Sequence, residues 1–474
     1  MGFVKSFEAG SIEAVAPPGL LLRLTTHTTA LLRRTGVSPV ILRGAAWSIS
    51  GNVAGAAASF LTQAILARTL AATRYGVYSY LLAWVNLAVL FGKLELDTAA
   101  LRFIGAYDGA RRDGLLRGFL RYGWRTVGSA AIGVALLGGT VAWLLRARLP
   151  AGTAGGIWAA ALLMPLSASL AFSSSALQGL RRVPQAQLPQ LLLRPVLFGV
   201  AILISAVGLG VELSAGGVVA LNAAATAVAL GVSLALLARA VPPRVVAAEP
   251  AFDRPQWMGA VRGLMIIALA QLVLSHQTDV LVVGTLLGPR DAGLYSAASQ
   301  LSSIIGLGAN GVFFVVLPVF SDLYARSRHD ELQRLVVRTV QGCTAVTVPV
   351  AALLCVAGPA VLHWYGPSFA GAAPVLFVLV AGQLAGLTVG GLSGFLLIMS
   401  GHEREASRVA VGTALLNLAL AVLLTPLLGM VGAALATVAA GFTRVGLLYW
   451  YARRTVGVAV LPYLPAALRE APGA

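Results

Sequence analysis

Charged residues are scarce in this sequence. Of its 474 residues, 58% are hydrophobic and 11% are charged, whereas soluble domains carry about 25% charged residues. So few charges could not cover the water-exposed surface of a protein of this size, which excludes a soluble protein and, with it, a nucleic-acid-binding protein. The net charge of +17 is better explained by the basic cytoplasmic loops of a membrane protein.

Cysteine is nearly absent, and motifs of enzyme chemistry are missing. Cys343 and Cys355 lie in one apolar stretch and offer neither a disulfide framework nor the spacing of metal ligands. The sequence contains no P-loop, no Ser-His-Asp order and no metal-ligand cluster. We therefore expect no catalytic residue, no metal site and no cofactor, and we expect that the protein is not an enzyme.

Long hydrophobic runs are abundant. A run of about 20 apolar residues can cross a bilayer as a helix. We identify twelve such segments, which predict an all-α integral membrane protein: 45–67, 76–100, 121–145, 154–178, 187–208, 215–238, 262–286, 292–318, 333–357, 372–398, 406–427 and 430–452.

The segments and the basic residues together predict a domain organisation. Two six-helix bundles, 41–238 and 262–452, are joined by a Pro-containing linker, 239–261, and flanked by the tails 1–40 and 453–474. When the N-terminus is placed in the cytoplasm, 29 of the 34 Lys and Arg residues fall on the cytoplasmic side. This asymmetry sets orientation in membrane proteins, so it predicts a plasma-membrane protein with both termini and the linker in the cytoplasm.

A short internal repeat supports the two-bundle organisation. Residues 69–79 and 285–296 share Thr-Leu, then Arg, then Gly-x-Tyr-Ser, with one gap. Both stretches follow the first span of their bundle, at the outer side of the membrane. Parallel repeats of this kind occur in secondary transporters, whereas the alternative is a convergent turn with an aromatic anchor at the interface.

Several loose motifs follow one another in the order of a known superfamily. They are residues 67–70 (Ala-Arg-Thr-Leu), 76–79 (Gly-Val-Tyr-Ser), 278–284 (Thr-Asp-Val-Leu-Val-Val-Gly), 292–295 (Ala-Gly-Leu-Tyr) and 317–321 (Leu-Pro-Val-Phe-Ser). In these motifs the sequence resembles the polysaccharide (O-antigen-type) flippases of the multidrug/oligosaccharidyl-lipid/polysaccharide exporter superfamily.

The resemblance implies two six-helix pseudo-repeats around a central cavity that opens alternately to each side. It also implies a polyprenyl-diphosphate-linked oligosaccharide as substrate, flipped from the inner to the outer leaflet, with a polysaccharide polymerase or glycosyltransferases as candidate partners. The alternative is a cation-coupled multidrug exporter of the same fold.

One acidic residue lies well inside a hydrophobic segment. Asp279 follows His276 by three residues, so the two side chains should share one face of a helix. An ionisable residue within a span is costly and points to function. We consider Asp279, with His276, a candidate site for the H⁺ or Na⁺ that drives transport, and a structural hydrogen bond to another helix is the alternative.

A second polar group lies in the fifth segment. Gln187, Gln190 and Arg194 follow the spacing i, i+3, i+7 and predict one polar stripe. Arginine binds phosphate groups well, so Arg194 is a candidate contact for the substrate diphosphate. The alternative is an arginine that extends to the inner membrane surface.

Uncharged polar residues in the first and eighth segments are further candidates. These segments line the cavity in the family that the chain resembles, so Asn52, Gln63, Gln300 and Asn310 are candidate contacts for sugar hydroxyls. Hydrogen bonds between helices are the alternative for each of them.

Overall fold

The computed structural model describes residues 39–150, 152–325, 328–389, 393–394, 397 and 402–456. It comprises two compact units, residues 1–48 and residues 49–474. The described part of the first unit is the beginning of α2, and the second unit contains the rest of the fold.

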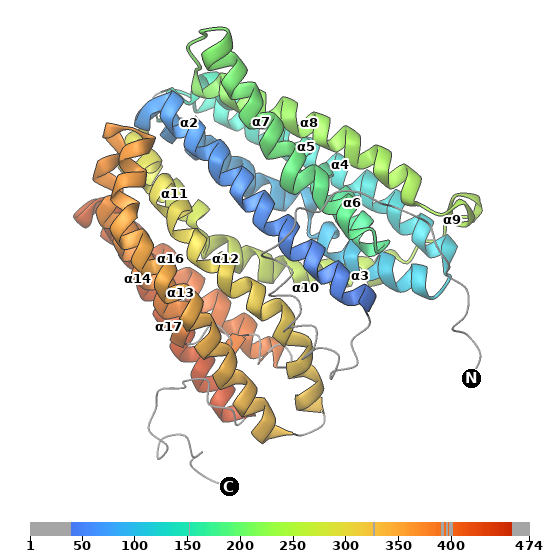
Figure 1. Cartoon of the computed structure of the whole chain (residues 1–474). Coiled ribbons are helices and arrows are strands. Elements are labelled where there is room, and N and C mark those ends of the chain that lie inside the picture. The colour runs from blue at the N-terminus through green and yellow to red at the C-terminus, as the bar shows by residue number, and fades with distance from the viewer. Residues whose placement is uncertain are drawn as a thin grey trace, which may run out of the picture. The chain divides into compact units, whose positions relative to one another are not determined.

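The regular structure of the described residues is entirely helical, as the composition predicts. The α-helices are α2 (Pro39–Lys93), α3 (Leu96–Gly109), α4 (Asp113–Leu144), α5 (Ile157–Gly179), α6 (Val183–Gln187), α7 (Arg194–Leu203), α8 (Ala215–Ala240), α9 (Pro243–Ala247), α10 (Arg254–Val273), α11 (His276–Leu286), α12 (Pro289–Ala325), α13 (His329–Tyr365), α14 (Ala373–Val389), α16 (Glu403–Leu428) and α17 (Met430–Val456). Two 3₁₀ segments, η1 (Ala154–Gly156) and η4 (Pro367–Ala372), and two π-helical segments, η2 (Leu188–Leu193) and η3 (Ile204–Gly208), complete the set. In Figure 1, α4, α5 and α8 pack together on one side, and α13, α14, α16 and α17 pack together on the other.

The number of membrane crossings is consistent with twelve. Ten helical segments of the described residues are long and apolar enough to cross a bilayer. One of them, Ser50–Lys93, has 44 residues and covers two predicted segments, with a break in the helical backbone at Ala71 (φ 57°, ψ 169°). A further helix, α12, covers the predicted segment 292–318. The protein is therefore an all-α, multi-pass membrane protein.

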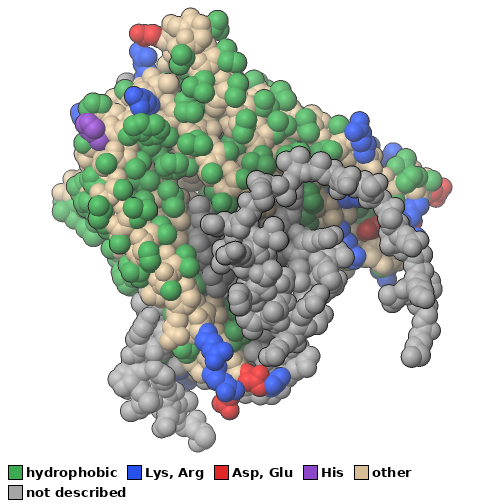
Figure 2. All heavy atoms as spheres, in the orientation of Figure 1, with side chains coloured by type: hydrophobic (Ala, Val, Ile, Leu, Met, Phe, Trp, Pro, Cys, Tyr) green, Lys and Arg blue, Asp and Glu red, His purple; other side chains and the backbone are tan. Residues whose placement is uncertain are grey.

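The surface agrees with this assignment. In the face shown in Figure 2, hydrophobic side chains cover the sides of the helices and charged side chains gather near helix ends. Large apolar side chains are exposed along α4, for example Leu136 (61%) and Leu137 (69%). An exposed apolar area of this extent is unusual on a soluble protein and suits contact with lipid.

The seventh predicted segment, 262–286, is not one continuous helix. It is divided into α10 and α11 by an extended residue, Ser275 (φ −85°, ψ 153°). The hydroxyls of Ser275 and Thr278 donate to the carbonyl oxygen of Leu272 at 2.6 and 2.8 Å. Such local bonds compete with the helical hydrogen bonds, which explains why the segment breaks at its polar stretch, residues 275–279. In transporters, broken helices place ion and substrate sites at their ends.

The two copies of the internal repeat lie against each other. A Cβ atom added at Gly76 would lie 1.6 Å from the carbonyl oxygen of Pro289, and one added at Gly293 would lie 2.4 Å from that of Ala72. Both glycines occupy the same position of the repeated Gly-x-Tyr-Ser sequence. The backbones can approach this closely only because neither residue has a side chain.

Further contacts join the two halves beside these glycines. The hydroxyls of Tyr80 and Thr285 are 3.1 Å apart, and the side-chain amide of Gln300 donates to the Tyr75 hydroxyl at 3.2 Å. The Tyr75 ring meets Phe369 edge to face at 5.7 Å between centroids. One buried apolar cluster includes residues of both halves, among them Tyr75 and Phe369. The halves are therefore closed against each other at the level of the repeat.

The predicted linker is docked onto the N-terminal half. Arg244 of α9 forms ion pairs with Asp108 of α3 (2.5 Å) and Asp113 of α4 (3.0 Å). Trp257, in the first turn of α10, is fully buried, and its indole N–H donates to the Tyr107 hydroxyl at 3.0 Å. The start of α10 is therefore fixed to α3 and α4, whereas its later turns contact α16 in the C-terminal half.

Candidate functional site

Asp279 is fully buried in the C-terminal half and lies in the first turn of α11. Its Oδ2 atom accepts hydrogen bonds from the hydroxyls of Tyr295 (2.7 Å) and Thr437 (2.8 Å). Within the described part of the chain, Oδ1 has no hydrogen-bond partner. The helix N-terminus stabilises a negative charge, but the two protein donors are neutral hydroxyl groups. These bonds tie α11 to α12 and α17, as the structural alternative expects. Uptake of a cation or a proton at Asp279 stays a prediction.

The surroundings of Asp279 link four helices to it. Thr437 of α17 lies 3.4 Å from the Oδ1 atom of Asn417 of α16, whose amide donates to the carbonyl oxygen of Val273 at the end of α10. Oxygen atoms of a carboxylate, an amide and a hydroxyl are thus neighbours here, and hard cations prefer such oxygen ligands. The break between α10 and α11 and the start of α17 converge on one carboxylate.

His276 lies beside Asp279, as the sequence predicts. Its Nδ1 atom is 3.7 Å from Asp279 Oδ2, and its Nε2 atom is 3.5 Å from the side-chain nitrogen of Gln383 in α14. His276 is half-buried and lines a cavity, whereas Asp279 is fully buried. Thr437, which is hydrogen-bonded to Asp279, lines the same cavity.

The cavity next to His276 has a volume of about 600 Å³ and is enclosed by α10, α11, α14, α16 and α17. Its wall is mainly apolar, and Gly386 of α14 and Gly441 of α17 leave open space in it. Gly382 of α14 instead packs against Val438. Arg444 of α17 also lines it, is half-buried, and has no ion-pair partner among the described residues. A half-buried guanidinium without a counter-ion is a good site for an anionic group.

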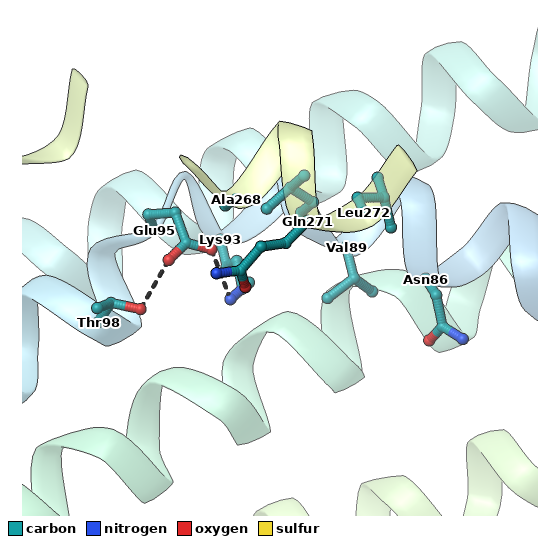
Figure 3. Close-up of a pocket in the computed structure, with 9 residues that line it drawn as sticks. Asn86, Val89, Lys93, Glu95, Thr98, Ala268, Gln271 and Leu272 are labelled. Atoms are coloured by element: carbon teal, nitrogen blue, oxygen red, sulfur yellow. Dashed lines mark hydrogen bonds and ion pairs between the residues drawn. The ribbon is translucent and has the colours of Figure 1, made fainter. Parts of the chain in front are cut away.

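A second cavity, of about 420 Å³, lies between α2, the start of α3 and α10 (Figure 3). Its polar wall is formed by Asn86, Lys93, Glu95, Thr98 and Gln271. Gln271 of α10 lines both cavities, which therefore adjoin at this side chain.

Arg194 lies in the N-terminal half, away from these cavity walls. Its guanidinium donates to Asn222 Oδ1 at 3.3 Å, and the Asn222 amide donates to the Tyr78 hydroxyl at 3.1 Å. The predicted stripe with Gln187 and Gln190 is interrupted, because the π-helical segment η2 lies between Gln187 and Arg194. Gln190 is exposed and Gln187 is half-buried beside Gly51 of α2. A substrate contact for these three residues stays a prediction.

The remaining candidates have varied environments. Tyr75 donates to the Gln63 side-chain oxygen at 3.3 Å, within α2 and across the break at Ala71. Tyr75 also accepts from Gln300, so Gln300 forms a bond between α12 and α2. Asn52 is exposed on α2. The side chain of Asn310 lies outside the described residues. Their contact with sugars also remains a prediction.

The repeat places two tyrosines at equivalent positions, and each contacts a polar side chain. Tyr78 of the first copy contacts Asn222, which binds Arg194, and Tyr295 of the second copy contacts Asp279. The first cluster therefore contains a half-buried arginine and the second a buried aspartate.

Sequence reasoning missed most of the residues around the two cavities. Thr437 and Tyr295 are ordinary residues of apolar segments, and no spacing connects them with Asp279. Arg444 was visible as a basic residue near the end of the last segment, where it resembles any cytoplasmic flanking arginine. The alignment of repeat copies could have indicated Tyr295, because it shares its position with Tyr78.

Two family models match the chain, each over more than half its length. The model described as polysaccharide biosynthesis protein matches residues 41–324, and the model described as lipid II flippase MurJ matches residues 190–469. Among curated proteins, the uncharacterized membrane protein EpsK of Bacillus subtilis (strain 168) is 29% identical over 108 residues. That match covers 23% of this chain and only 21% of EpsK.

Solved structures with the same fold include transporters and a flippase. An inward-facing multidrug resistance MATE family transporter of the MOP superfamily has a TM-score of 0.69 at 13% identity and covers 84% of this chain and 94% of its own. The lipid II flippase MurJ in an inward closed conformation has a TM-score of 0.63 at 15% identity, with 85% and 86% covered. A MOP superfamily transporter from Pyrococcus furiosus has a TM-score of 0.60 at 13% identity, with 88% and 95% covered. At these identities the likeness shows the fold alone.

Proposed function

This chain belongs to the polysaccharide biosynthesis protein family, within the superfamily of multidrug, oligosaccharidyl-lipid and polysaccharide exporters, and from that premise we propose that it flips a polyprenyl-diphosphate-linked oligosaccharide from the inner to the outer leaflet. The match to the lipid II flippase model supports a protein that moves its substrate without covalent chemistry. Under this proposal the N-terminal half and the C-terminal half alternate between two relative positions in the plasma membrane, and both termini lie in the cytoplasm. A polymerase or glycosyltransferases would act on the lipid before and after it crosses.

The observation that carries the proposal is an arginine that lines an apolar cavity and has no ion-pair partner among the described residues. Arg444 lines the cavity of about 600 Å³, and a diphosphate offers several oxygen acceptors to the five N–H donors of one guanidinium. The apolar wall suits the first isoprene units of the lipid, whereas the charged group suits the diphosphate. A purely apolar drug would use the wall but not the arginine.

The coupling ion is assigned to Asp279 in this proposal. The carboxylate is fully buried, and its protein hydrogen bonds come from Tyr295 and Thr437. Binding of H⁺ or Na⁺ there would neutralise the charge and hold α11, α12 and α17 together. Because His276 lines the same cavity as Arg444, the ion and the substrate would reach neighbouring positions from one side.

The test of substrate binding compares two changes at Arg444. Purified protein in liposomes is supplied with the fluorescent polyprenyl-diphosphate oligosaccharide, and transfer between leaflets is followed by its accessibility to an external lectin. Arg444→Ala should reduce transfer at least tenfold, since loss of a charged hydrogen bond costs about 1.5–3 kcal/mol, and Arg444→Lys should retain part of it. Arg239→Ala, at an exposed arginine of α8, is the matched control. Full transfer by Arg444→Ala would remove this residue from the site.

The test of coupling compares ion gradients. Asp279→Asn keeps the shape of the side chain and removes its charge, so transfer should no longer respond to a Na⁺ or a pH gradient. Asp330→Asn, at an exposed acid of α13, should respond like the wild type. An Asp279→Asn protein that still follows the gradient would refute coupling at this residue.

The multidrug exporter is the other outcome of these experiments. Gradient-driven export of organic cations, together with no transfer of the lipid-linked oligosaccharide by the wild type, would favour it.

A further inference from the structure

The cavity between α2, α3 and α10 presents two amide groups that the protein leaves unused. Asn86 of α2 and Gln271 of α10 both line it, and neither forms a side-chain hydrogen bond within the described ranges. Each amide offers donors and an acceptor, which is the complement of a sugar hydroxyl or an N-acetyl group. The volume of about 420 Å³ lies within the range of ligand cavities, roughly 300–1,000 Å³.

The charged part of the wall is held in a fixed geometry. Lys93 Nζ lies 2.9 Å from Glu95 Oε1 and 2.7 Å from Asp97 Oδ2, and the Thr98 hydroxyl donates to Glu95 Oε2 at 2.6 Å (Figure 3 shows the contacts of Glu95). Glu95 is 6% exposed and Asp97 is 9% exposed. Two carboxylates share one ammonium group here, so the cluster holds one more acidic than basic side chain.

The break between α2 and α3 creates this arrangement. Leu94 and Glu95 both have left-handed backbone conformations, with φ of 51° and 56°. Residues other than glycine rarely adopt this backbone conformation. Here the two left-handed residues turn the chain so that Lys93, before the break, contacts Asp97, after it. The carboxylate of Glu95 is thereby directed to the cavity wall.

From these observations we infer that this cavity binds the sugar that is attached to the diphosphate, and that it selects neutral sugars over sugars that carry a carboxylate. The inference rests on the proposed function, because Gln271 borders both cavities and a diphosphate near Arg444 would present its first sugar to the neighbouring wall. The amides of Asn86 and Gln271 bind the hydroxyl and N-acetyl groups. A uronic acid would bring a second uncompensated negative charge next to Glu95, and such repulsion is an effective device of specificity.

The experiment measures binding of three lipids to the full-length protein in nanodiscs. The probes are bare polyprenyl diphosphate, the same lipid with one N-acetylhexosamine, and the same lipid with one hexuronic acid. The wild type should bind the N-acetylhexosamine lipid at least tenfold more tightly than the hexuronic acid lipid. Asn86→Ala combined with Gln271→Ala should abolish the gain in affinity that the N-acetylhexosamine adds over the bare lipid.

A charge change tests the selectivity directly. Glu95→Gln should improve binding of the hexuronic acid lipid about tenfold with little effect on the other two lipids, and Asp97→Asn serves as the second variant if Glu95→Gln does not fold. Glu212→Gln, at an exposed acid after α7, should leave all three affinities unchanged. Equal binding of both sugar lipids by the wild type would overturn this inference but not the proposed function. Failure of all three lipids to bind would instead overturn the proposed function.

Discussion

The contact between the two glycines of the repeat predicts how a single methyl group would act. In Gly76→Ala, the new Cβ would lie 1.6 Å from the carbonyl oxygen of Pro289 and 2.9 Å from the backbone nitrogen of Gly293. Backbone atoms cannot rotate away as side chains do, so the two copies of the repeat must move apart. Overpacking costs about 1–3 kcal/mol. This cost corresponds to a shift of roughly 5–150-fold in the conformational equilibrium, toward a state in which the two copies of the repeat are apart.

The shift can be measured by the reactivity of a cysteine placed in the first copy of the repeat. Both native cysteines are first replaced by alanine, and Ala72→Cys is introduced, because Ala72 is 3% exposed and its carbonyl oxygen faces Gly293. Gly76→Ala should increase the rate of maleimide labelling at this position by at least fivefold.

Two controls distinguish separation of the two copies of the repeat from general unfolding. Gly128→Ala adds a methyl group on α4 where no atom lies within 4 Å, so labelling at position 72 should stay at the original rate. Ala176 is fully buried in the N-terminal half. A cysteine introduced there by Ala176→Cys should stay unreactive when Gly76→Ala is also present. Unchanged labelling of Ala72→Cys in the Gly76→Ala protein would refute the assignment of the glycine pair as the closing contact of the two halves.

Three further predictions concern the linker and the bundle core. Trp257→Ala should lower the free energy of unfolding by about 3–5 kcal/mol, measured by thermal unfolding in detergent, because the indole is fully buried. Arg244→Ala should speed thermolysin cleavage within residues 239–253, with an effect of about 1 kcal/mol, because its ion pairs are partly exposed; an unchanged cleavage rate would show that the pairs do not hold the linker. Ser233→Ala should cost about 1 kcal/mol in the same unfolding assay, because it removes the buried 2.6 Å hydrogen bond to Ser173; no loss of stability would contradict that assignment.

The membrane architecture could be predicted from the sequence because apolar segments of this length are rare outside membrane-spanning helices. Helices in a bilayer satisfy their own backbone groups, so the long apolar segments identified the helices without knowledge of their packing. The break at Ser275 escaped prediction, because it depends on hydroxyl hydrogen bonds that apolar composition does not reveal.

The candidate site was only partly predictable. Asp279 and His276 were found because an ionisable residue inside a span stands out against apolar neighbours, and their proximity follows from one helical turn. Thr437 comes from a helix about 160 residues later, and the cavity beside Arg444 requires five helices to assemble. Such long-range neighbours are set by tertiary packing, for which a single sequence carries little signal.

The docked linker has a consequence for how the chain is made. Leu237 of α8 packs in the same buried cluster as Val245, Trp257 and Val261, so the N-terminal half gains part of its core from residues that follow its last membrane helix. A chain truncated after residue 240 would lack Arg244 and Trp257, the partners of Asp108, Asp113 and Tyr107. We therefore expect the packing around α3 and α4 to be completed during synthesis only after the beginning of α10 has left the ribosome.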